Sequence, residues 1–273
     1  MDLRSIDAGL QIAATQGLTL NLQERTSLEL ALSTLKKTEQ SVNDPFFWGK
    51  LLGQEDDYYV AYFTEPAATV CPQKKFFYST KAFKFRPLPA LTANEAKKFD
   101  TIRTVTLTGN PTWAADTNEE DDAEPRDQRL TELHMLSGLV ARIDDGTAVV
   151  PRGAYTVQND HTLIPSPEFK GLVYSNAQEL SSWVHFRPAE NLETLRRLAA
   201  NDYQFHADAF ESLQDDVPRG SWVFRHDPIS GTVTLRSLMW PGYVAYCVLN
   251  TTTFGSVYIG SGEQNVDLPF LLL

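Results

Sequence analysis

The sequence predicts an α+β fold: an antiparallel β-rich core, amphipathic helices at the N-terminus, and short helices between strands. Three observations support this class. The first 40 residues place apolar side chains at helical spacing, the segments from residue 46 onward alternate apolar and polar side chains, and the last 57 residues are aromatic segments separated by glycine and proline. Such alternation is what a sheet with one covered face requires. The chain of 273 residues could bury roughly three quarters of its unfolded surface.

Two helices are predicted in the N-terminal segment 1–45. Ser5 caps the first and Gly17 ends it, and a capping box of Asn21 and Glu24 begins the second. Their apolar stripes are Ile6, Leu10 and Ala13 in the first helix, and Leu28, Ala31, Leu32 and Leu35 in the second. Short amphipathic helices cannot bury themselves, so we expect this segment to pack on the sheet or on another chain.

Residues 46–113 form the first β-rich region. The segments 47–53 and 58–63 flank a polar turn, which is typical of a hairpin. Further strands are predicted at 76–78, 82–85 and 102–107, and a brief helix is predicted to begin at the cap Thr92.

Residues 114–129 form an acidic loop. Between Asp116 and Asp127 there are seven acidic side chains and one arginine, a net charge of -6. This segment therefore carries more than half of the formal net charge of -11. A segment that repels itself and contains almost nothing apolar is expected to be a solvated, disordered loop. The alternative is an acidic tether for a basic partner.

Residues 130–273 form an α+β region that ends in an antiparallel sheet, and we expect this region to make one compact unit with 46–113. Apolar residues recur at helical spacing from Leu130 to Ile143, which predicts a helix. Further helices are predicted near 177–186 and 192–199, and the aromatic strands follow them.

Composition limits the classes of function. The net charge of -11 argues against binding to nucleic acid or to an anionic membrane, because both need clustered Lys and Arg. Cys71 and Cys247 lie far apart and in no metal-binding spacing, so we expect thiols in a reducing compartment. The N-terminus lacks the features of a signal peptide and no run of 18 apolar residues occurs, so a soluble, cytoplasmic protein is expected.

Motifs for catalysis are scarce. The five histidines stand singly, without the spacing of a metal site. A serine-hydrolase triad could be drawn from Ser166, His161 and Asp160, but neighbours in sequence rarely meet its geometry. The run 260–262 resembles the start of a dinucleotide fingerprint, yet Asn265 stands where its third glycine belongs. We therefore predict no catalytic residue, cofactor or metal.

Aromatic residues and two arginines are the candidates for a protein interface. The aromatic candidates are Trp222, Trp240, Tyr243, Tyr246, Tyr258 and Phe270. They form either the chain's own core or anchors for another subunit, where Trp and Tyr are enriched. Arg152 and Arg219 each follow a proline in similar turns, and they are either contacts for a carboxylate or solvated turn residues.

Several separated motifs resemble those of the radial spoke head protein 9 family. They are FWGK at 47–50 with DYY at 57–59, VPRGA at 150–154, DVPRGSW at 216–222, LRSLMWPG at 235–242 and FGSVYIGSGEQNVDLPF at 254–270. The resemblance spans about residues 20–273, and the acidic loop 114–129 is peculiar to this chain.

The resemblance implies a structural, non-catalytic subunit of the radial spoke head in the axoneme of motile cilia and flagella. Its implied partners are other radial spoke head proteins, notably the spoke head four and six paralogues, and the family carries no catalytic residues. Two alternatives come from the residues themselves. One is a hydrolase with an unrecognised site, and the other is a β module that binds a peptide along an exposed strand.

Overall fold

The computed structural model describes residues 1–3, 5–39, 43–65, 71–102, 104–113, 130–157, 163–200 and 210–272. The acidic loop predicted at 114–129 lies outside these residues. The helices are α1 (Ile6–Ala14), α2 (Leu22–Thr38), α3 (Ala93–Thr101), α4 (Glu132–Thr147), α5 (Tyr174–Ala177), α6 (Leu192–Ala200) and α7 (Leu268–Leu271). The strands are β1 (Phe46–Leu51), β2 (Tyr58–Glu65), β3 (Gln73–Ser79), β4 (Arg86–Pro87), β5 (Val149–Pro151), β6 (Tyr155–Val157), β7 (Leu163–Pro165), β8 (Trp183–His185), β9 (Trp222–Asp227), β10 (Thr232–Ser237), β11 (Tyr243–Val248) and β12 (Phe254–Gly260).

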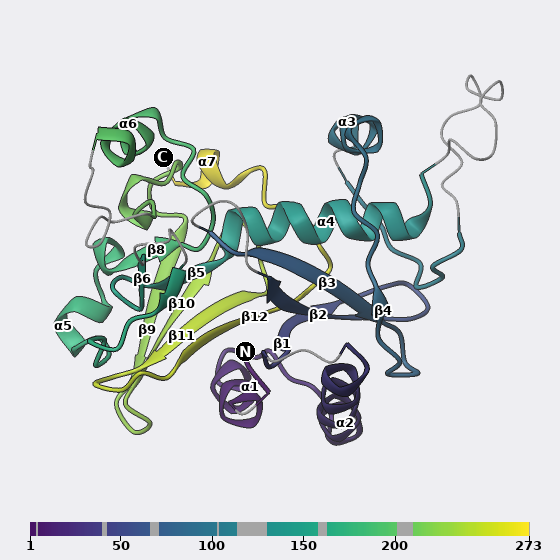
Figure 1. The fold of residues 1–273 in the computed structure, drawn as a ribbon, viewed down its shortest axis with the longest axis horizontal. Coiled ribbons are helices and arrows are strands. Elements are labelled where there is room, and N and C mark those ends of the chain that lie inside the picture. Colours follow the sequence, from purple (N-terminus) through teal and green to yellow (C-terminus); the bar gives the residue numbers. More distant parts are fainter. Residues whose placement is uncertain are drawn as a thin grey trace.

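One large sheet organises the molecule, and the predicted α+β class is confirmed. Within the described residues this sheet has eight strands in the order β4-β3-β2-β1-β12-β11-β10-β9 (Figure 1). Every neighbouring pair is antiparallel except β1 and β12, which are parallel. The sequence predicted an antiparallel sheet and did not foresee this pairing, which joins the N-terminal and C-terminal strands.

The joint between β1 and β12 depends on a glycine. Gly49 lies opposite Tyr258 in the register, beside a bulge in β1. A Cβ atom on Gly49 would lie 2.1 Å from the backbone carbonyl oxygen of Tyr258. Any larger residue would therefore force the two backbones apart, which gives the glycine of the FWGK motif a structural reason.

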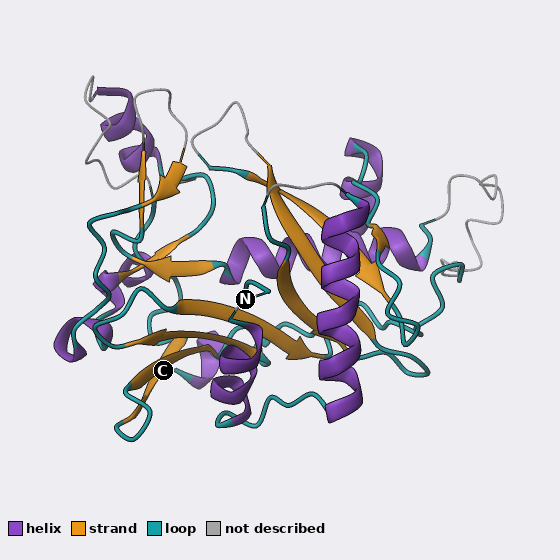
Figure 2. Ribbon diagram, turned by 60° about the horizontal axis from the view of Figure 1, so that its bottom comes forward, coloured by secondary structure: helices purple, strands orange, loops and turns teal. Residues whose placement is uncertain are grey.

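Helices α1 and α2 cover one face of the sheet, as Figures 1 and 2 show. The predicted capping box is confirmed, because the Asn21 side chain accepts from the amide of Glu24 at 2.8 Å and the Glu24 carboxylate accepts from the amide of Asn21 at 2.7 Å. The predicted apolar stripes of both helices are buried against the sheet. The N-terminal segment thus packs on its own chain.

Helix α4 covers the opposite face (Figure 1). Its first residue, Glu132, is fully buried, and its carboxylate accepts hydrogen bonds from the Tyr58 hydroxyl at 2.7 Å and the Gly109 amide at 2.7 Å. Near its other end, Asp144 accepts from the Trp48 indole at 3.0 Å and pairs with Lys74 at 2.6 Å. Polar anchors at both ends therefore fix the helix on β1, β2 and β3.

Two strands predicted before the acidic loop are wrong. Lys81 and Ala82 form a turn, residues 83–85 are irregular with a positive φ of 50° at Phe83, and only Arg86–Pro87 pairs with β3. The described residues of 102–107 form no strand. They lie as a connection whose Leu107 carbonyl accepts from the Gln54 amide at 2.9 Å.

The helix predicted at 177–186 is also wrong. Helix α5 ends at Ala177, a single 3-10 turn spans Leu180–Ser182, and Trp183–His185 is strand β8, which pairs with β5. Trp183 is fully buried, and its indole donates to the Ala177 carbonyl at 3.1 Å. The predicted helix at 192–199 is confirmed as α6. Among the described residues no helix has both the length and the apolar character needed to cross a lipid bilayer.

Candidate functional site

Five of the six aromatic candidates lie inside the chain. The exposed fractions are 8% for Trp222, 4% for Trp240 and Tyr243, 0% for Tyr246 and 1% for Tyr258. Burial raises the pKa of the Tyr246 and Tyr258 phenols to about 12. These side chains pack in the two cores of the sheet, so the alternative that they form the chain's own core accounts for their burial.

The other candidates reach the surface to different extents. Phe270 in α7 is 75% exposed, and Arg219 is exposed in the turn before β9. Arg152 is half-buried in the turn after β5, where its amide donates to the Ser182 carbonyl at 2.8 Å. Arg219 and Trp222 line one small cavity, but the eight candidates do not gather on one surface.

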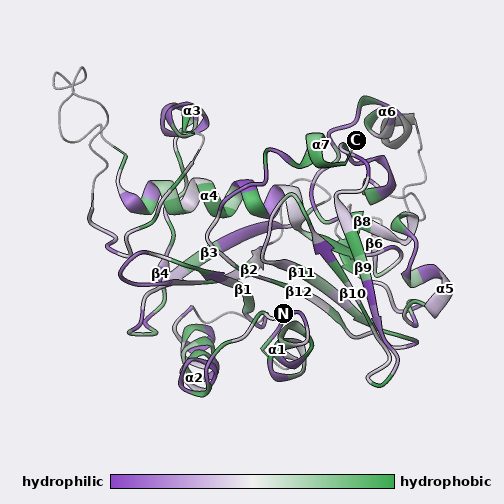
Figure 3. Cartoon of the chain, turned by 180° about the vertical axis from the view of Figure 1, so that it is seen from behind, coloured by the Kyte–Doolittle hydropathy of each residue, from purple (hydrophilic) through white to green (hydrophobic). Residues whose placement is uncertain are grey.

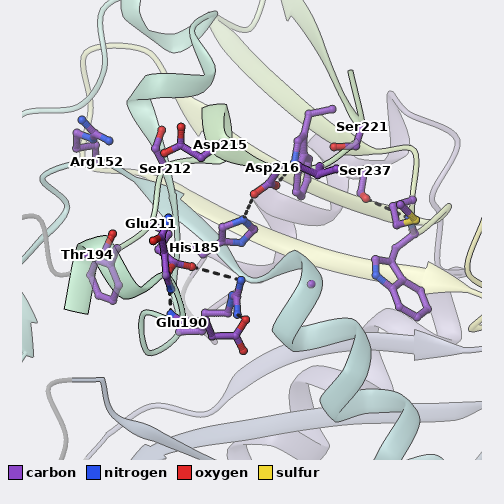
Figure 4. Close-up of a pocket in the computed structure, with 18 of the residues that line it drawn as sticks. Arg152, His185, Glu190, Thr194, Glu211, Ser212, Asp215, Asp216, Ser221 and Ser237 are labelled. Carbon is purple, nitrogen blue, oxygen red and sulfur yellow. Dashed lines mark hydrogen bonds and ion pairs between the residues drawn. The ribbon is translucent and has the colours of Figure 1, made fainter. Parts of the chain in front are cut away.

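A large polar cleft lies between α6 and β8 on one side and the ends of β9 and β10 on the other (Figure 4). Its volume is about 1060 Å³. Three members of the predicted set line it, Arg152, Trp222 and Trp240, together with His185, Arg187, Glu211 and Asp216. A hydrolase would need a nucleophile and a general base placed together in a cleft of this kind.

Asp216 bridges two elements at the base of the cleft. One carboxylate oxygen lies 2.8 Å from Nε2 of His185, and the other accepts from the Trp222 indole at 2.7 Å. Because a carboxylate only accepts, Nε2 of His185 is the donor in this hydrogen bond. His185 is 3% exposed, so this bridge ties β8 to the start of β9.

Glu211 performs a similar task on the other wall. Its Oε1 accepts from the amide of Glu190 at 2.8 Å and from the amide of Asn191, just before α6. The Arg187 guanidinium nitrogens lie 3.5 Å from Oε2 of Glu211 and 2.7 Å from Oε2 of Glu190. These carboxylates hold the chain at the entrance to α6, because each is bound to a backbone amide or to a cation.

The cleft does not present the arrangement of a nucleophilic hydrolase among the residues described. None of the serines in its lining donates a hydrogen bond to His185. The described part of the chain contains no group of three His, Cys, Asp or Glu side chains placed to hold a metal ion. His161 and Asp160 of the triad drawn from the sequence lie outside the described residues.

Exposed apolar side chains gather at the C-terminal end of the chain. Phe270 and Leu271 in α7 are 75% and 70% exposed, and α7 is coloured as strongly hydrophobic in Figure 3. Leu272 lies 3.5 Å from the position that a Cβ atom on Gly220 would take. Val217 in the same turn is 89% exposed. Apolar side chains in contact with water at neighbouring positions are typical of a surface that binds another protein.

Comparison with known proteins gives a consistent result. No family model matches the chain. The chain is 30% identical over 280 residues to radial spoke head protein 9 homologues of Mus musculus, Danio rerio and Homo sapiens. In each comparison the similarity covers 100% of this chain and 100% of the relative.

Proposed function

Because the chain belongs to the radial spoke head protein 9 family, we propose that it is a structural, non-catalytic subunit of the axonemal radial spoke head. In this role it supports assembly of the spoke head and, through it, the regulation of ciliary and flagellar motility. The observation that carries the proposal is similarity along the whole chain to several proteins with that one name.

The described surface supports a role in assembly. The exposed apolar side chains of α7 and of the turn 217–220 are a contact surface of the kind that subunits bury on association. Asp216 and Glu211, two carboxylates of the polar cleft, are engaged in bonds that hold the chain together. Of the residues predicted as interface candidates, Arg219 and Phe270 have the exposure that the role requires.

We propose the spoke head four and six paralogues as the direct partners. Co-expression of this chain with each paralogue, followed by affinity purification and gel filtration, is expected to give a stable complex. Glu168→Ala, an exposed position outside α7 and the turn 217–220, serves as the control and should leave the complex intact. If this chain fails to associate with every spoke head subunit, alone or in combination, the proposal is wrong.

The location of the protein gives an independent test. A fluorescently tagged copy in a cell with motile flagella is expected along the axoneme, and its loss is expected to reduce the other spoke head subunits in isolated axonemes. A uniform cytoplasmic signal with unchanged spoke heads in the null strain would contradict the role.

A further inference from the structure

The two rims of the large sheet differ in how they end. One rim is β4, which has two residues and ends in Pro87. The other is β9, which has six residues, no proline and a regular register with β10 (Figure 1). Among the described residues β9 has one ladder neighbour. Short strands and prolines protect a sheet rim against further pairing, so β4 is protected and β9 is open.

The register shows which backbone groups of β9 face outward. The Leu238 amide donates to the Ser221 carbonyl at 2.8 Å, and bonded positions alternate along an antiparallel pair. Positions 223 and 225 therefore bond to β10, and Trp222, Phe224 and His226 turn their N–H and C=O groups away from it. Within the described residues these three amides donate no hydrogen bond outside the ladder. The outward N–H and C=O groups of these three residues have the spacing that an extended chain needs to form ladder hydrogen bonds.

Two features at the start of β9 extend this surface. A small cavity of about 270 Å³ adjoins the strand, and its lining combines the apolar Leu180, Leu213 and Trp222 with the polar Gln214, Asp215, Asp216, Arg219 and Ser221. Beside it lies the turn with the exposed Val217, which α7 reaches through Leu272. An extended segment that pairs with β9 and continues past Trp222 would meet this cavity of mixed polar and apolar lining.

A second copy of this chain fits the rim less well. Two β9 strands paired about Phe224 would place the two Arg225 side chains as diagonal neighbours, roughly 7–8 Å apart. Like charges at this distance oppose pairing. A strand from a different subunit, with an acidic or neutral residue at that position, avoids the repulsion.

We propose that β9 is a docking rim that takes an extended strand from a neighbouring spoke head subunit. The strand pairs with the backbone of Trp222, Phe224 and His226, and its continuation reaches the small cavity beside Trp222. This inference rests on the proposed function, because it describes how the subunit would join its partners.

A matched pair of variants at His226 tests the backbone contact. His226→Ala and His226→Pro both remove the imidazole, which stacks on Tyr174 with ring centroids 4.4 Å apart. Only the proline removes the outward N–H, and proline is tolerated at a strand rim when that N–H faces away from the sheet. Against the spoke head four or six paralogue, His226→Ala is expected to bind within about twofold of wild type. His226→Pro is expected to weaken binding by tenfold or more.

Hydrogen exchange on wild-type protein gives a second measurement that does not depend on the stability of a variant. In the free chain the amides of Val223 and Arg225 should exchange slowly and those of Phe224 and His226 quickly. In the complex with the paralogue the fast pair should slow by at least tenfold, which a side-chain interface alone would not produce.

The outcomes separate the two proposals. If wild type forms the complex but Phe224 and His226 exchange at unchanged rates and His226→Pro binds like His226→Ala, β9 is not the docking rim and the subunit role stands. If wild type forms no complex with any spoke head subunit, the subunit role itself is wrong.

Discussion

Replacing Glu132 with alanine is expected to destabilise the fold strongly. The carboxylate is fully buried and accepts from the Tyr58 hydroxyl at 2.7 Å, the Thr108 amide at 3.1 Å and the Gly109 amide at 2.7 Å. Each buried donor that loses its acceptor costs about 1–3 kcal/mol. Because the connection at 108–109 can relax in part, we expect Glu132→Ala to lower the free energy of unfolding by about 4 kcal/mol.

Glu132→Gln is the more discriminating variant, because it conserves volume. One oxygen remains as an acceptor, but the new amide group must point N–H hydrogens at a group that is itself a donor, such as the Gly109 amide. The expected loss is about 2 kcal/mol. Glu168→Ala, on an exposed carboxylate, serves as the control and should stay within about 0.5 kcal/mol of wild type.

Urea unfolding followed by tryptophan fluorescence measures these losses. The chain has five tryptophans, and Trp183 is fully buried, so unfolding should change the emission. One ordinary hydrogen bond contributes about 1 kcal/mol. If the free energy of unfolding of Glu132→Ala differs from that of the control by less than about 1 kcal/mol, the carboxylate does not organise this end of α4.

Two further predictions concern ionisation. Burial opposes charge on Glu24, but hydrogen bonds from Lys50 and other donors outweigh it and hold its pKa below the ordinary 4.5. The free energy of unfolding of wild type should therefore decrease as pH falls below 4.5. In urea titrations at several pH values, Glu24→Gln should show a smaller decrease over the same range. Burial raises the pKa of Cys71 to about 11 and of Cys247 to about 12. The thiols of the unfolded chain ionise first as pH rises above 9, so the free energy of unfolding should fall in that range. At pH 8 a thiol reagent should react with the native protein about 100-fold or more slowly than with the urea-unfolded chain.

Local signals in the sequence were sufficient for the first helices. The capping box of Asn21 and Glu24 involves residues three positions apart, so the sequence alone contains all the groups that form it. The stripe from Leu28 to Leu35 specified the buried face, because helical spacing determines which side chains share a side. The partner of that face, the sheet of the same chain, could not be known from these residues.

The wrong elements failed for a non-local reason. Residues 102–107 are rich in β-branched side chains, namely Ile102, Thr104, Val105 and Thr106, but a strand also needs a neighbour with unpaired backbone groups. Among the described residues no strand pairs with this segment. Its Leu107 carbonyl instead accepts from the Gln54 amide, and the Thr108 amide just after it donates to the Glu132 carboxylate. Trp183 and Val184 lie in a segment that was predicted to be helical, but they form strand β8 because they pair with β5, which lies more than 30 residues earlier in the chain.

The candidate interface shows the same limit. Trp and Tyr suit both a core and a docking surface, and the choice depends on which faces of the sheet are covered. Helix α4 and helices α1 and α2 cover both faces, which leaves Tyr246 and Tyr258 inside. Arg219 and Trp222, two of the candidates predicted from the sequence, lie at the proposed docking rim, but no pattern in the sequence indicated the outward backbone groups of β9.

The continuity of the sheet predicts that the chain cannot be divided at the acidic loop. Fragments 1–113 and 130–273 would each lose the β1–β12 pairing, and the contacts of α4 with Trp48, Tyr58 and Lys74 would also be separated. Each fragment alone would expose a sheet rim and an apolar face, so we expect both to be insoluble. Expressed together, with a tag on one, they should purify as a pair, because no described strand pairing depends on residues 114–129. A fragment that is soluble alone and unfolds cooperatively would show that the two regions are separate domains.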